Sequence, residues 1–153
     1  MRHVLAAAIL TAFIPAWADQ PVTFAARDDG FVVSSTATGS VRKDGPFLAV
    51  ALTRHTLREG KEYKMPTMVI EYRLGLAHNN AQGRWEVVRW SDAFAAGFTM
   101  NPGETRQLPA ITALIPIDNL SSLQGFWLVV EVKVQRDGAV GTTYAHSQKL
   151  PID

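Results

Sequence analysis

The stretch FWLVVEVKVQ, residues 126–135, decides the fold class of this chain. Its apolar side chains alternate along the chain, so that Phe126, Leu128, Val130, Val132 and Val134 would share one face of an extended segment. The opposite face mixes tryptophan, valine and polar residues. This alternation predicts a central β-strand with one buried face and one partly solvated face.

The next residues predict that this strand returns as a hairpin. Asp137-Gly138 follows the alternating stretch, and an Asp-Gly pair between two such stretches is a strong hairpin signal because Gly accepts a positive φ without strain. Residues 140–150 would then form the returning strand, which ends at Pro151.

Short stretches with the same alternation recur upstream, bounded by Gly, Pro, Asn and Asp. Further strands are expected near residues 22–27, 31–37, 47–56, 67–78, 84–90, 98–100, 105–108 and 111–115, with single helical turns possible at 92–96 and 118–123. The pattern predicts an all-β protein, an antiparallel immunoglobulin-like β-sandwich of about seven to nine strands. Uneven strand lengths disfavour a regular closed up-and-down sheet, and the absence of cysteine excludes a disulfide.

The first eighteen residues have the pattern of an export signal. A basic start at Arg2 is followed by an apolar stretch over residues 4–14, and Ala16-Trp17-Ala18 has the small-x-small pattern of a cleavage site. The apolar stretch is too short to span a bilayer, which takes about 20 residues. We therefore expect residues 1–18 to be a signal peptide and residues 19–153 a single domain in the periplasm or outside the cell.

The composition disfavours several classes of partner. Fifteen Lys and Arg residues stand against fourteen Asp and Glu, and removal of Arg2 with the signal makes the two counts equal. A neutral chain without a basic run is not expected to bind nucleic acid or an anionic membrane surface. Without cysteine there is no thiolate metal site, cysteine nucleophile or lipid-modified anchor.

No catalytic or cofactor motif is present, so a non-enzymatic protein without a cofactor is expected. The chain has neither a Gly-x-Ser-x-Gly elbow nor a His-Glu-x-x-His motif. One metal alternative is copper bound by His55, Met65, Met68 and His78, with Met100 as a further thioether, because soft sulfur suits Cu(I). The spacing is not diagnostic, since an extended Met-Pro-Thr-Met segment would place its two methionines on opposite faces.

A set of arginines and tryptophans is the candidate binding surface. Arg73, Arg84, Trp85, Arg89 and Trp90 belong to one expected hairpin over residues 67–90, and Trp and Arg are the residues that most often dominate interfaces. In a regular strand Trp85 and Trp90 would point to opposite faces, so that they could not both be core residues, and one of them is the expected binding anchor.

Two functional hypotheses follow from these observations. The first is an exported non-catalytic protein–protein interaction domain that accompanies or chaperones another exported protein, or inhibits an exported enzyme. The alternative is a periplasmic sandwich that binds copper or a small ligand through the His and Met residues named above.

Overall fold

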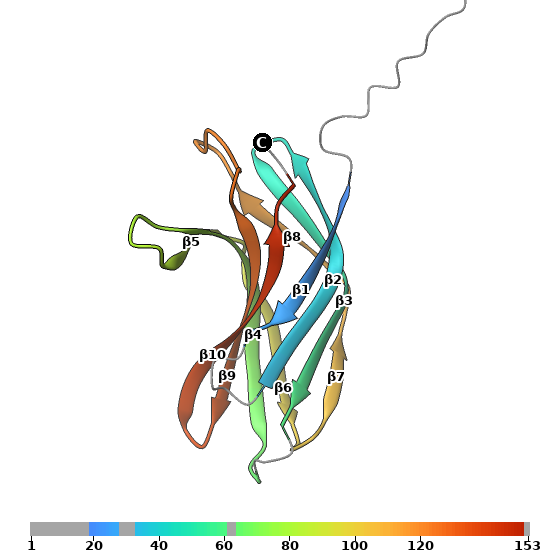
Figure 1. The fold of residues 1–153 in the computed structure, drawn as a ribbon. Helices are drawn as coiled ribbons and strands as arrows, with labels where there is room; N and C mark the ends of the chain where they lie inside the picture. The colour runs from blue at the N-terminus through green and yellow to red at the C-terminus, as the bar shows by residue number, and fades with distance from the viewer. Residues whose placement is uncertain (1–18, 28–32, 61–63, 152–153) are drawn as a thin grey trace, which may run out of the picture.

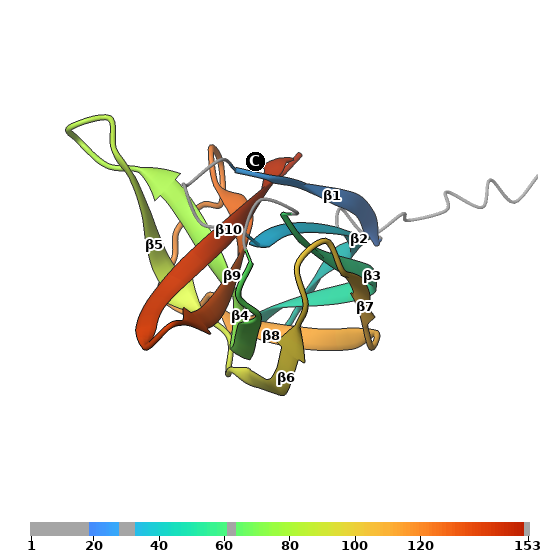
Figure 2. The same ribbon diagram turned by 90° about the horizontal axis from the view of Figure 1, so that it is seen from below.

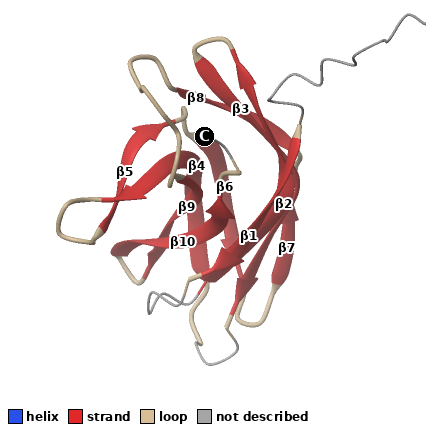
Figure 3. Cartoon of the chain, turned by 45° about the horizontal axis from the view of Figure 1, so that its top comes forward, coloured by secondary structure: helices blue, strands red, loops and turns tan. Residues whose placement is uncertain are grey.

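The computed structural model describes residues 19–27, 33–60 and 64–151, and in these ranges every regular element is a β-strand (Figure 3). The strands are β1 (Gln20–Ala26), β2 (Val33–Asp44), β3 (Phe47–Glu59), β4 (Thr67–Asn79), β5 (Trp85–Trp90), β6 (Phe94–Met100), β7 (Thr105–Leu108), β8 (Ile111–Pro116), β9 (Trp127–Arg136) and β10 (Ala139–Lys149). The all-β prediction is confirmed. The possible helical turns were wrong, because residues 94–96 begin β6 and residues 118–123 form turns and bends.

All ten strands belong to one antiparallel sheet, in the order β5-β4-β9-β10-β1-β2-β3-β7. Strands β6 and β5 pair with successive parts of the same edge of β4, and β8 and β7 do the same along β3. The sheet curls, so that β1, β2 and β3 face β4 and β9 as in a sandwich (Figures 1 and 2). The antiparallel sandwich-like architecture agrees with the sequence; the immunoglobulin-specific strand arrangement stays a prediction.

The core lies between these two halves. On β9, the alternate residues Leu128, Val130, Val132 and Val134 are all completely buried, as predicted. They meet buried side chains from the facing half, among them Phe24 of β1. Burial of each large apolar side chain contributes on the order of 1.5–3 kcal/mol, and this contact between halves makes the curled sheet one unit.

The hairpin between β9 and β10 has the predicted turn. Asp137 and Gly138 both have positive φ, 47° and 76°, and Ala139 lies directly opposite Arg136. Two successive positive φ values are typical of the two-residue type I′ turn, whose twist matches that of the strands.

The predicted signal peptide, residues 1–18, lies outside the described residues. Within the ranges described, the structure has no helix long and apolar enough to cross a membrane.

Candidate functional site

A β-bulge brings the two hairpin tryptophans onto the same face. In the β4–β5 pairing Leu76 lies opposite Arg89, but Ala77 lies opposite Val87, so Val88 is an extra residue. The extra residue reverses the alternation between the two ends of β5. Trp85 and Trp90 therefore both lie on the outer face of the sheet, and the inference that they point to opposite faces was wrong.

Trp90 is held between the sheet and an arginine. Its ring packs over Gly75, where an added Cβ would come within 2.8 Å of the ring carbons. The Arg73 guanidinium carbon lies 3.7 Å from the centroid of the Trp90 ring, and Arg73 Nε donates a hydrogen bond of 2.9 Å to Glu131 Oε1. Cation–π pairs at such half-exposed positions contribute about 0.5–1 kcal/mol. The ion pair with Glu131 fixes the guanidinium over the ring.

Trp85 reaches across the sheet to β10. Its ring makes edge-on contacts with Tyr144, at 5.1 Å between centroids, and with His146, at 4.8 Å. The Arg27 guanidinium lies 5.6 Å from the centroid of the same ring. Trp127 Nε1 donates to His146 Nδ1 at 2.9 Å, which orients the imidazole. These residues come from β5, β9 and β10, and Arg27 directly follows β1.

We call this set of half-buried side chains the outer-face cluster; it consists of Arg73, Trp85, Trp90, Trp127, Tyr144 and His146. The cluster covers small apolar residues that also lie on the outer face. Ala77 and Val129 are completely buried although they point away from the main core. The rings therefore have a structural role, since they shield a second apolar layer, and they also present a partly exposed aromatic and cationic surface.

The remaining two predicted binding residues lie apart from the cluster. Arg84 is exposed at the end of the β4–β5 turn, where its backbone N–H donates to Asn80 Oδ1. Arg89 of β5 lies opposite the core residue Leu76 and therefore on the inner face of the sheet. Its guanidinium donates hydrogen bonds to the carbonyl oxygens of Val88 and Asp118. Three of the five predicted residues thus share one surface.

Sequence reasoning did not select Tyr144 or His146. The sequence did indicate that these two residues share a face, because they are two positions apart in the returning strand of the predicted hairpin. Their pairing with Trp85 depends on the fold, because β5 and β10 are separated in the sheet by β4 and β9.

His55 is part of the core and not of a surface site. It is 1 % exposed, its Nε2 lies 2.8 Å from Ser35 Oγ, and its ring packs edge-on against Tyr72. Burial lowers the pKa of His55 to about 4, because the charged imidazolium would lose its hydration. Ser35 is completely buried as well, so this serine–histidine pair is inaccessible to a substrate.

The other proposed metal ligands lie in two separate places. His78 pairs with Glu86 at 2.9 Å and stacks on Phe126, near one end of β4. Met65 and Met68 lie at the opposite end of β4 and line one surface hollow, because the chain bends at residues 64–65. The opposite placement of the two methionines was expected only for an extended segment, and the chain is not extended at Met65.

The structure does not bring His55, His78 and the two methionines into one site. Met100, the further thioether considered, is completely buried. Within the described ranges, no group of three or more His, Cys, Asp or Glu residues is arranged to hold a metal ion.

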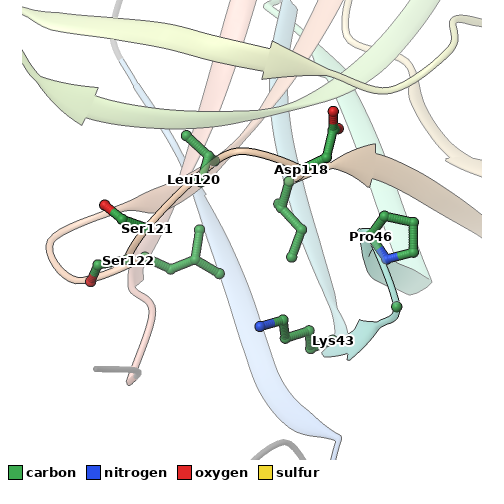
Figure 4. Close-up of a pocket in the computed structure, with 9 residues that line it drawn as sticks. Lys43, Pro46, Asp118, Leu120, Ser121 and Ser122 are labelled. Carbon is green, nitrogen blue, oxygen red and sulfur yellow. The ribbon is translucent and has the colours of Figure 1, made fainter.

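A small cavity opens at the end of the sandwich that carries the β2–β3 turn (Figure 4). Its volume is about 230 Å³, and its lining includes Lys43, Leu123, Ser121 and Ser122. The Asp118 carboxylate at its rim points away from Lys43 (Figure 4). The lining thus combines apolar side chains with an ammonium, a carboxylate and hydroxyl groups, a composition suited to a small polar ligand.

A scan against protein-family models and a search of curated proteins found no match to this chain.

Proposed function

We propose that this protein is an exported, non-catalytic protein–protein interaction domain that works in the periplasm or outside the cell. It would accompany or chaperone another exported protein, or inhibit an exported enzyme. The export part of the proposal rests on residues 1–18, and the interaction part rests on the outer-face cluster.

The observation that carries the proposal is the common face of Trp85 and Trp90. Arg73 is stacked on Trp90 at 3.7 Å and anchored by Glu131, so the pair is already ordered before a partner arrives. Ordered aromatic and arginine side chains lose little conformational entropy on binding, which is why such residues often dominate interfaces.

The test compares affinity with stability. Tagged protein beginning at Asp19 is used to isolate a stoichiometric partner from periplasmic extract of the native host, and the affinity of the purified pair is then measured. Trp90→Ala is expected to weaken binding about thirtyfold, which corresponds to about 2 kcal/mol, while the melting temperature stays well above the assay temperature. Trp85→Ala is measured in the same way.

Matched controls lie on other parts of the surface. Arg54→Ala removes an exposed arginine from β3, as a control for Arg73→Ala, and Phe47→Ala removes an exposed ring, as a control for the tryptophans. Neither control should change affinity by more than about twofold. If both tryptophan variants melt early and bind as their folded fraction predicts, the cluster is only structural and the proposal loses its binding surface.

A second candidate function is the binding of a small ligand, and the cavity beside Lys43 favours it. Its volume of about 230 Å³ fits a ligand of only a few heavy atoms. A thermal-shift series with small carboxylates, repeated on Lys43→Met, tests this candidate. Titration with copper, followed by tryptophan fluorescence, tests the metal form of the same alternative.

A further inference from the structure

The sulfur atoms of this chain are confined to methionine, since it has no cysteine and four methionines. Three of these lie in the described ranges, and they differ sharply in exposure. Met65 and Met68 are each 45 % exposed, whereas Met100 is completely buried. Any oxidant that reaches the folded protein therefore meets two accessible thioethers and one that is shielded.

The two exposed methionines share one place on the surface. Met68 lies between Thr99 of β6 and Gln135 of β9 in the sheet register. Met65 stands just before β4 and lines the same hollow, which Asp137 of the β9–β10 turn also borders. Neither methionine belongs to the apolar core, so their large apolar side chains are not explained by packing.

We propose that the Met65–Met68 hollow is a modification site at which peroxides oxidise both thioethers while the fold stays intact. In each step the sulfur lone pair attacks one oxygen of hydrogen peroxide, the O–O bond breaks, and an S–O bond forms. The sulfur loses two electrons to the peroxide, whose other oxygen leaves as water after proton transfer. Each methionine becomes its sulfoxide, a state that methionine sulfoxide reductases can reverse.

The surroundings explain why the oxidised state is tolerated here. A sulfoxide oxygen is a strong hydrogen-bond acceptor, and the hollow offers the Thr99 hydroxyl, the Gln135 amide and solvent as donors. At Met100, which is completely buried among the core side chains, the same oxygen would be placed where solvent cannot reach it. Oxidation would therefore make the hollow more polar and leave the sandwich unchanged.

The experiment treats folded protein beginning at Asp19 with hydrogen peroxide and maps the products by peptide mass spectrometry. Met65 and Met68 are each expected to gain one oxygen at least tenfold faster than Met100. In urea at a concentration that unfolds the protein, the three rates should converge, because exposure alone separates them. The Met65→Leu/Met68→Leu variant should gain no oxygen in the folded state over the same time.

Two results would overturn the proposal. The first is oxidation of Met100 in the folded protein at a rate within threefold of the other two. The second is a fall of more than about 4 °C in melting temperature once Met65 and Met68 are oxidised, because a tolerated modification should shift it less than that. Restoration of the original mass by a methionine sulfoxide reductase is the expected confirmation of reversibility.

Discussion

At the scale of single residues, burial of titratable groups is the feature with the clearest energetic consequence. Glu59 is completely buried at the end of β3, and its Oε1 accepts hydrogen bonds from Thr67 Oγ1 at 2.6 Å and from an Arg136 guanidinium nitrogen at 2.7 Å. These two hydrogen bonds connect β3, which carries Glu59, to β4 and to β9. Because breaking a buried ion pair leaves an uncompensated charge, these residues constrain how the three strands meet.

His55 should make the protein sensitive to acid. Its pKa is about 4 in the folded state, against 6.5 for a free imidazole. Between these two values the unfolded chain binds a proton that the folded chain does not, so the free energy of unfolding falls as the pH drops through that window. The loss should reach about 3 kcal/mol by pH 4.

The check is urea unfolding at several pH values from 7 down to 4.5. His55→Gln keeps an amide that can bond Ser35 but cannot titrate, so its free energy of unfolding should depend less steeply on pH between 6.5 and 5. Equal slopes for the two proteins would contradict a lowered pKa at His55.

At the scale of elements, the strands could be predicted from the sequence but the bulges could not. The alternation in β9 is a local property, and its burial pattern matches the prediction from Leu128 to Val134. The bulge at Val88 has no such signal, because an extended segment looks the same with or without an unpaired residue. The error about Trp85 and Trp90 came from this single extra residue.

The register of β9 predicts that substitutions at neighbouring residues differ strongly in their effect on the free energy of unfolding. Val130→Ala or Val132→Ala removes methyl groups from a completely buried contact and should cost about 1–3 kcal/mol. Lys133→Ala, on the outer face, breaks only an exposed 4.0 Å pair with Glu71 and should cost less than about 0.5 kcal/mol. Denaturant unfolding of the three variants measures the difference. Equally mild losses would mean that the buried face is assigned wrongly.

Two glycines in the sheet predict steric effects of different size. A Cβ at Gly75 would meet the Val87 and Trp90 side chains at 2.6–2.8 Å, and these side chains can move. A Cβ at Gly39 would lie 1.9 Å from the Ala51 carbonyl oxygen, which is fixed in the sheet. Gly75→Ala should therefore lower the free energy of unfolding by about 1–3 kcal/mol, and Gly39→Ala should lower it further.

Thermal unfolding of both variants gives the order of these losses. Adding Trp90→Ala to Gly75→Ala should remove part of the steric penalty, since the clashing ring is gone, and a double-mutant cycle measures that coupling. Purely additive losses would show that Trp90 does not pack over Gly75.

At the scale of the whole molecule, strand β1 connects the two halves of the sheet. It pairs with β10 on one side and with β2 on the other, and among the residues that the structure describes no other strand pairing links the group β5-β4-β9-β10 to the group β2-β3-β7. This arrangement follows from contacts between distant parts of the chain, so strand order could not be derived from local alternation. The binding residues contributed by β10 could not be selected for the same reason.

The position of β1 gives a prediction about processing. The strand begins at Gln20, so cleavage after Ala18 would leave it whole, whereas removal of residues up to Ala26 would take Val22 and Phe24 out of the core. Mass spectrometry of the protein recovered from its native host should find the N-terminus within a residue or two of Asp19.

Folding of shortened chains tests the role of β1. A chain beginning at Asp19 should show a β-dominated circular dichroism spectrum and a cooperative thermal unfolding transition. A chain beginning at Arg27 should not fold stably, because it loses two buried side chains and leaves the facing edges of β10 and β2 unpaired. An N-terminus that retains Met1 would contradict export, and an unchanged melt without β1 would contradict its role as the connection between the halves.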